Sequence, residues 1–441
     1  MLGPGLTHTA THGGSGESLL PTPPATSEPS PSVTSPETPT PDGTTSSGPS
    51  AADKAARDAA VTALLDRRAV AITNHDRASF LGVVDSSATS FLAAQADVFD
   101  RVSSLPVQSW TYVLTGAGPE LTASRDAELP AGSAILRVRL TYRLSGTDTS
   151  TDREQLLTVV PRDGAWLLSS DTDGSASGFD TERDLWDLGD VSSVRGRSSL
   201  VVADSRATKA EMRRLAREAD TAVAGVDKVW THEWSRHPVV VLPRTQADMA
   251  VLIGGNGDGL AQIAAVTTGT FESGLSRGDR IVINPGAWDT LGPLGRQVVL
   301  THEMTHVATR SSSAASVPIW LSEGFADYVA YRTAPVPLSI VASDVLDEVR
   351  AGKGPRELPV DKDFDASRGD IASSYEGAWL ACRMIATKYG EGQLVGLYAA
   401  LADGEGAGWP AETVEVLGVS DRTLVTQWRA FLRAKAGSRA S

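Results

Sequence analysis

Residues 298–310, VVLTHEMTHVATR, place the strictest condition on how this chain can fold. His302 and His306 stand four positions apart, and positions i and i+4 of an α-helix lie on one face about one turn apart. A helix here can direct both imidazoles at one metal ion, held about 2.0–2.1 Å from each ring nitrogen. Glu303 lies beside that face, where its carboxylate can reach a water molecule at the metal. The alternative is an ordinary core helix whose histidines only pack.

Glu303 favours the metal site over that alternative. The residues before and after the motif are largely apolar, VVLT and VATR, so the helix is predicted to be buried. A buried carboxylate without a partner is costly. A metal-activated water beside Glu303 removes that objection.

A site with three protein ligands needs one more donor. No histidine follows His306, so a third histidine downstream is excluded and carboxylates remain. The stretch WLSEGFADYVAYR, residues 320–332, supplies Glu323 on a second predicted helix. Asp327 lies one turn later on the same face, where it can accept a hydrogen bond from a ligand histidine and fix its orientation. The sequence therefore predicts His302, His306 and Glu323 as metal ligands, with Asp327 behind them.

The two segments THEMTHVATR and IWLSEGFADYVAYR together resemble the HExxH and ExxxD helices of the gluzincin clan of zinc metallopeptidases. The pattern is similar to that of the peptidase MA-like group, and to the catalytic domain of aminopeptidase N and thermolysin-like enzymes. The resemblance covers roughly residues 197–436. It implies a thermolysin-like zincin domain of the α+β class that binds Zn²⁺ and hydrolyses peptide bonds with metal-activated water. Glu303 matches the general base of that clan.

The same resemblance extends to Tyr375 in SSYEGAW, which matches the tyrosine position of aminopeptidase N-like enzymes. It implies that Tyr375 is a catalytic residue that donates to the developing oxyanion. The segment GDRIVINPGAW, residues 278–288, matches the strand at the sheet edge beside the metal, where an extended peptide can add as a further strand. The motif with which true aminopeptidases bind a free amino terminus is absent, and IVINPGAW stands in its place. We therefore expect an endoprotease acting on extended segments. The alternative is a catalytically silent zinc-fold protein with a binding or envelope-associated role.

The rest of the chain divides by composition. Residues 20–50 consist almost entirely of Pro, Ser, Thr, Gly and acidic residues, which predicts a disordered linker over residues 1–52. Two helical patterns followed by long runs of period two predict a small α+β domain over residues 53–185. Its pattern is similar to that of the nuclear-transport-factor-like fold. The segment WDLGDVSSVRG, residues 186–196, is predicted as a hinge before the metallopeptidase domain.

Charge and composition limit the partners. The net charge of −14 argues against nucleic acid as a partner. Cys382 is the only cysteine, so neither an intrachain disulfide nor a cysteine-based metal site can form. No apolar run is long enough to span a membrane, and the first residues lack the features of a signal peptide. The linker composition favours an extracytoplasmic or cell-surface protein with an anchor or signal encoded upstream, whereas the given start taken alone indicates a cytoplasmic one. A peptide or protein substrate is the expected partner.

Overall fold

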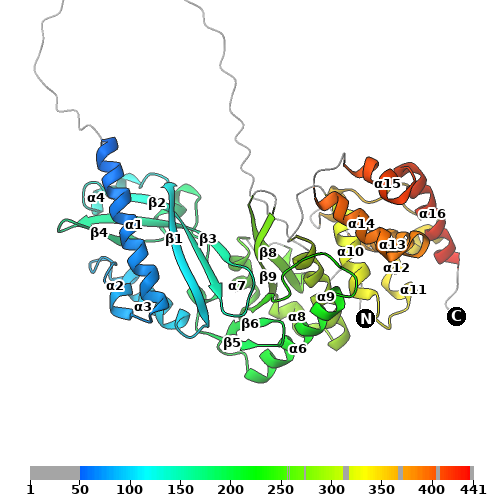
Figure 1. Cartoon of the computed structure of the whole chain (residues 1–441), viewed down its shortest axis with the longest axis horizontal. Helices are drawn as coiled ribbons and strands as arrows, with labels where there is room; N and C mark the ends of the chain where they lie inside the picture. Colours follow the sequence, from blue (N-terminus) through cyan, green and yellow to red (C-terminus); the bar gives the residue numbers. More distant parts are fainter. Residues whose placement is uncertain are drawn as a thin grey trace, which may run out of the picture.

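The structure is a computed structural model of the whole chain. It describes residues 50–255, 257, 259–272, 275–310, 317–365, 371–403 and 408–437. The predicted linker over residues 1–52 lies almost entirely outside the described residues. The described chain is mixed α+β, as predicted. Figure 1 shows an N-terminal sheet with its helices at one end, a second sheet in the middle and a group of helices at the other end.

The N-terminal unit combines a four-stranded antiparallel sheet with the helices α1 to α4, which confirms the helices and strands expected in this region. The sheet order is β1-β2-β3-β4. Its strands are β1 (Val107–Ala117), β2 (Ala134–Leu144), β3 (Thr151–Arg162) and β4 (Ala165–Ser170). Its helices are α1 (Ala51–Thr73), α2 (Arg77–Leu81), α3 (Thr89–Val102) and the short α4 (Ala123–Glu128) between β1 and β2. A capping box between Ser50 and Asp53 begins α1.

The second sheet has five strands in the order β5-β6-β7-β9-β8. Its strands are β5 (Val191–Arg195), β6 (Leu200–Asp204), β7 (Val239–Leu242), β8 (Ala265–Glu272) and β9 (Leu275–Ile283). The three inner strands are parallel, and β5 and β8 pair antiparallel at the two sides. The predicted hinge over residues 186–196 is wrong. Its second half forms β5, because Gly196 closes a tight turn, with its N–H donating to the carbonyl of Ser199 at 2.8 Å.

The prediction that residues 278–288 supply the sheet edge is also wrong. β9 lies between β7 and β8, and β8 is the outer strand among the described residues. The strand β8 pairs with β9 in a hairpin that sets Thr267 opposite Ile281. Its sequence AVTTGTFE carries only a weak alternation, which is why the sequence alone did not indicate a strand there. The edge strand beside the helix that carries HExxH is therefore β8.

The inner strands of the second sheet are buried on both faces, and the two faces belong to different cores. Val201 and Ile281 pack in a core with the helices α6 (Lys209–Val226) and α9 (Pro293–Arg310). Val202 and Val282, whose side chains point the other way, pack in the core of the N-terminal unit. Side chains alternate between faces along a strand, so one short strand can supply both cores. The N-terminal unit thus lies directly against the back of the second sheet.

Gly278 shows how closely the two units approach. Its φ is +66°, and a Cβ atom there would lie 2.7 Å from the carbonyl oxygen of Ser150 and 2.7 Å from the Cα of Thr151. Both of those are backbone atoms at the start of β3. Glycine is therefore required at this position for its conformation and for the close contact.

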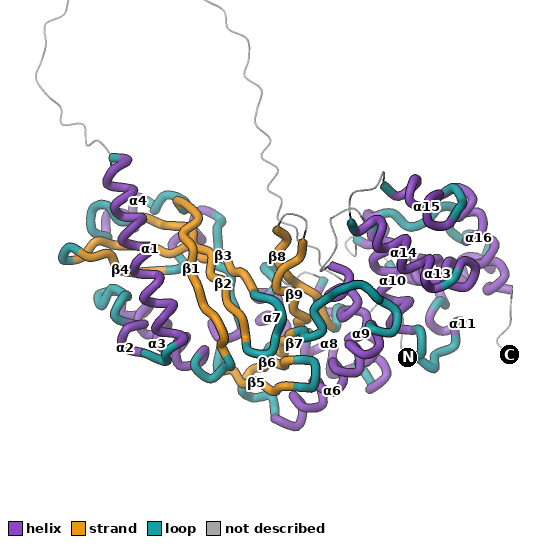
Figure 2. Tube along the Cα trace, viewed as in Figure 1, coloured by secondary structure: helices purple, strands orange, loops and turns teal. Residues whose placement is uncertain are grey.

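From α9 onward the chain is helical, as Figure 2 shows. The helices around the candidate site are α10 (Ile319–Tyr331), α13 (Ala372–Tyr389) and α14 (Glu391–Ala402). The predicted helices carrying HExxH, Glu323 and SYEGAW are all present. None of the helices in the described ranges combines the length and apolarity needed to cross a lipid bilayer.

Gly324 allows α10 and α13 to pack in close contact beside the candidate site. A Cβ atom there would lie 2.5 Å from the carbonyl oxygen of Ala378 and 3.0 Å from the sulfur of Cys382. Gly324→Ala is expected to lower the free energy of unfolding by about 1–3 kcal/mol through overpacking. Gly392→Ala is the matched control, because Gly392 also lies in a helix but has open space around it. That change should be neutral or stabilising by up to about 1 kcal/mol. Urea unfolding measures both, and equal effects would contradict the packing argument.

Candidate metal centre

Three side chains from two adjacent helices meet in the interior. His302 and His306 come from α9 and Glu323 comes from α10, and their exposed fractions are 0%, 2% and 5%. One ligand atom from each can be chosen so that all lie within 4.8 Å of one another. The Nε2 atoms of the two histidines are 3.1 Å apart. An oxygen of Glu323 lies 3.3 Å from Nε2 of His302 and 3.6 Å from Nε2 of His306. This buried group could hold a metal ion.

Asp327 fixes the orientation of one ring, as the sequence predicted. Nδ1 of His302 lies 2.8 Å from Oδ1 of Asp327, one turn beyond Glu323 on α10. A carboxylate can only accept here, so Nδ1 carries the proton and donates it. Nε2, the other ring nitrogen of His302, is then the one that faces His306 and Glu323. Such a partner holds both the tautomer and the ring plane of a metal-binding histidine.

The charges of the group are strongly coupled. Burial alone would lower the pKa of His302, but Asp327 and Glu323 outweigh it and raise that pKa well above its usual value. Burial alone would raise the pKa of Glu323, but His306 and His302 lower it well below its usual value. The helices therefore hold an ionised carboxylate among imidazoles in the protein interior. A cation shared by these groups would take the place of the proton that the imidazoles otherwise share with the carboxylate.

Glu303, the residue after His302 on α9, is completely buried. Its Oε2 accepts a hydrogen bond from the hydroxyl of Thr267 at 2.7 Å. Its Oε1 has no hydrogen-bond partner among the described residues. Burial raises the pKa of Glu303, while His302 and His306 oppose the rise. One oxygen is thus anchored, the other is available, and the carboxylate is a stronger base than an exposed glutamate.

Thr267 is the residue at this site that the sequence did not reveal. It lies on β8 and is fully buried. Its hydroxyl also lies 3.0 Å from the carbonyl oxygen of Glu303, and its own carbonyl accepts from Nη1 of Arg310 at 3.1 Å. Both contacts join the edge strand to α9. A threonine in an unrecognised strand carries no sequence signal that could have pointed to this role.

Tyr375 lies in the first turn of α13, buried to 4% exposure, and packs edge-on against Phe364 with ring centroids 5.0 Å apart. Burial raises the pKa of Tyr375 well above its usual value. Nearby carboxylates raise this pKa further: those of Glu323, Asp327 and Glu303. The phenol therefore stays protonated and belongs to the electrostatic environment of the three ligands.

Every site residue predicted from the sequence lies in this one region. Comparison of the chain with models of known protein families gives no match, and comparison with curated protein sequences gives no significant match.

Proposed function

We propose that this chain is a zinc-dependent metallopeptidase of the gluzincin, MA-like type. The observation that carries the proposal is the buried group of His302, His306 and Glu323 next to a buried glutamate, Glu303, whose Oε1 has no hydrogen-bond partner among the described residues. Two imidazoles and one carboxylate form a ligand set that catalytic zinc sites use, with a fourth position left for water or substrate. The donor atoms and the proton on Nδ1 of His302 fit that ion. When bound, zinc supplies Lewis-acid polarisation of a carbonyl and activation of water near neutral pH.

Each of the chain's own residues at the site would then have a distinct role. Glu303 accepts a proton from the attacking water at Oε1 and passes it to the leaving amine. Thr267 holds Oε2, so that Oε1 keeps one position. Tyr375, whose phenol stays protonated, donates to the oxyanion that forms on the substrate carbonyl. Asp327 keeps the ring of His302 in its working orientation.

The arrangement of the elements supports the same proposal. The second sheet and the helices α9 and α10 would form the zincin domain, with the metal group between the sheet edge and the helices. The N-terminal unit, in which helices accompany a four-stranded antiparallel sheet, is similar in layout to a nuclear-transport-factor-like domain. No residue of that unit is among the ligands.

Substrate would bind at the edge strand β8. Because β8 is outermost among the described strands, an extended peptide could add to it through backbone hydrogen bonds. Thr267 connects this strand to Glu303, so a peptide paired there would run past the general base. Backbone pairing makes little demand on side chains or on a free amino terminus. We therefore expect cleavage within extended segments.

The deciding experiment combines metal analysis with a peptide library. The purified chain should contain one equivalent of zinc and should cleave both acetylated and free-amine peptides at internal bonds. A chelator should abolish cleavage, and added zinc should restore it. Trimming of free-amine peptides alone would indicate an exopeptidase. Zinc without any cleavage would indicate a catalytically silent binding protein.

Thr267→Val tests the anchoring of the general base. The substitution keeps the shape of the side chain but removes the hydrogen bond to Glu303. A hydrogen bond to a charged group contributes about 1.5–3 kcal/mol, so kcat is expected to fall by about 10- to 100-fold. Zinc content and KM should change little. Thr267→Ser, which retains the hydroxyl, should recover most of the rate, and a slow Ser variant would contradict the assigned role.

A further inference from the structure

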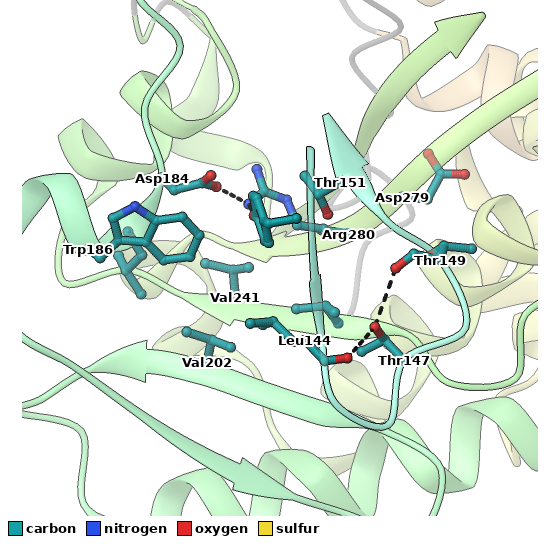
Figure 3. Close-up of a pocket in the computed structure, with 13 residues that line it drawn as sticks. Leu144, Thr147, Thr149, Thr151, Asp184, Trp186, Val202, Val241, Asp279 and Arg280 are labelled. Atoms are coloured by element: carbon teal, nitrogen blue, oxygen red, sulfur yellow. Dashed lines mark hydrogen bonds and ion pairs between the residues drawn. The ribbon is translucent and has the colours of Figure 1, made fainter. Parts of the chain in front are cut away.

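A second polar site lies between the two units, on the opposite face of the second sheet from the metal centre. It is a cavity of about 20 Å³ at the junction of β2, β3, β9 and the turn before α5 (Leu185–Leu188). Figure 3 shows Asp184 joined to Arg280, with Thr151 next to Arg280. Because Arg280 pairs in register with Thr268, its side chain points away from the face on which Thr267 contacts Glu303.

Arg280 is buried to 4% exposure and uses only part of its guanidinium. Its Nη1 forms an ion pair with Asp184 and donates to the hydroxyl of Tyr142 at 3.2 Å. Its Nε and Nη2 are both buried and have no hydrogen-bond partner among the described residues. These two groups form one edge of the planar guanidinium and present parallel N–H donors. Leaving two charged donors unsatisfied in the interior is expensive.

The charges around the cavity do not balance. Asp184 is shared by two buried guanidiniums, because Nε of Arg153 lies 3.3 Å from its Oδ2. The other carboxylate that lines the cavity, Asp279, lies 3.9 Å from Nη1 of Arg310. The guanidiniums of Arg153 and Arg280 thus share the single carboxylate of Asp184, and this group of three side chains carries one excess positive charge in a place shielded from water. A buried charge is stable only when it is paired and hydrogen-bonded.

We propose that this cavity binds one small planar oxyanion, of the size of formate or bicarbonate. The anion would accept both hydrogen bonds from Nε and Nη2 of Arg280 and neutralise the excess charge. An arginine edge matches such an anion in geometry as well as in charge, which a lysine ammonium does not. The cavity exceeds the roughly 10–15 Å³ that one water molecule needs, and its size limits the ligand to a few atoms. The site is independent of the proposed peptidase activity, since none of its residues contacts a metal ligand.

Titration of the full chain with sodium formate tests the proposal, with sodium chloride held to keep the ionic strength constant. Isothermal titration calorimetry should show saturable binding at one formate per chain, and the melting temperature should rise to a plateau over the same range. Arg280→Lys keeps the charge that pairs with Asp184 but removes the parallel donors. It should weaken formate binding at least 10-fold. Arg206→Lys, at an exposed position, is the matched control and should bind as the wild type does.

Two results would overturn the proposal. Absence of saturable formate binding to the wild-type chain would show that the cavity holds only water, whatever the variants do. Equal binding by wild type and Arg280→Lys would show that formate binds elsewhere. A crystal grown in sodium formate would locate the anion directly if Arg280→Lys failed to fold.

Discussion

Glu303→Gln is expected to leave bound zinc unchanged and to reduce peptide hydrolysis by at least about 10²–10⁴-fold, the usual effect of losing a general base. The amide has nearly the shape of the carboxylate and can still accept the hydrogen bond that Thr267 donates. It cannot accept a proton at the position of Oε1. Burial raises the pKa of the native carboxyl, so the substitution removes a base that is stronger than an exposed glutamate.

The measurement pairs the zinc content of the variant with its rate on an internally cleaved peptide. Glu415→Gln, at an exposed position on α15 (Trp409–Leu417), is the control for a general effect of replacing a glutamate. A variant at position 303 that cleaves as fast as the wild type would exclude the proposed mechanism. Loss of zinc would instead show that Glu303 supports the ligands rather than the reaction.

His306→Ala is expected to reduce bound zinc to background. The substitution removes one of the three proposed ligands and leaves His302 and Glu323, too few to hold zinc in a three-ligand site. His302 would remain fixed by Asp327, so the effect should come from the missing donor rather than from a collapsed helix.

Elemental analysis after dialysis against a chromophoric chelator measures this loss. His237→Ala is the matched control, because His237 is exposed and pairs with Asp148 at 2.7 Å, away from the three ligands. That variant should retain a full equivalent. Full zinc retention in His306→Ala would refute the ligand assignment.

The candidate metal site could be predicted from the sequence because the signals for it are local. The spacing of His302 and His306 fixes their shared face as soon as the segment is helical, and the same holds for Glu323 and Asp327. Only the meeting of the two helices had to be assumed, and the structure shows it.

The features that could not be predicted from the sequence depend on pairing between segments that are distant along the chain. β8 is a strand because it pairs with β9, and only that pairing brings Thr267 to Glu303. In the sequence, Arg280 is a single arginine in a strand of alternating residues. Nothing in that pattern predicts that it pairs with Asp184 from another unit. The order of strands in the sheet also depends on pairing between distant segments. The prediction from the sequence therefore placed β9, rather than β8, at the sheet edge.

The core that continues from the N-terminal unit through the back of the second sheet has a thermodynamic consequence. Val202 and Val282 lose their packing if either unit unfolds, so the two units should melt in one cooperative transition. Binding to the native state stabilises everything that unfolds with it. Zinc at α9 would thus raise the melting temperature of the N-terminal unit too, although it touches none of that unit's residues. The metal-free chain would reveal that linkage by losing both units together at a lower temperature.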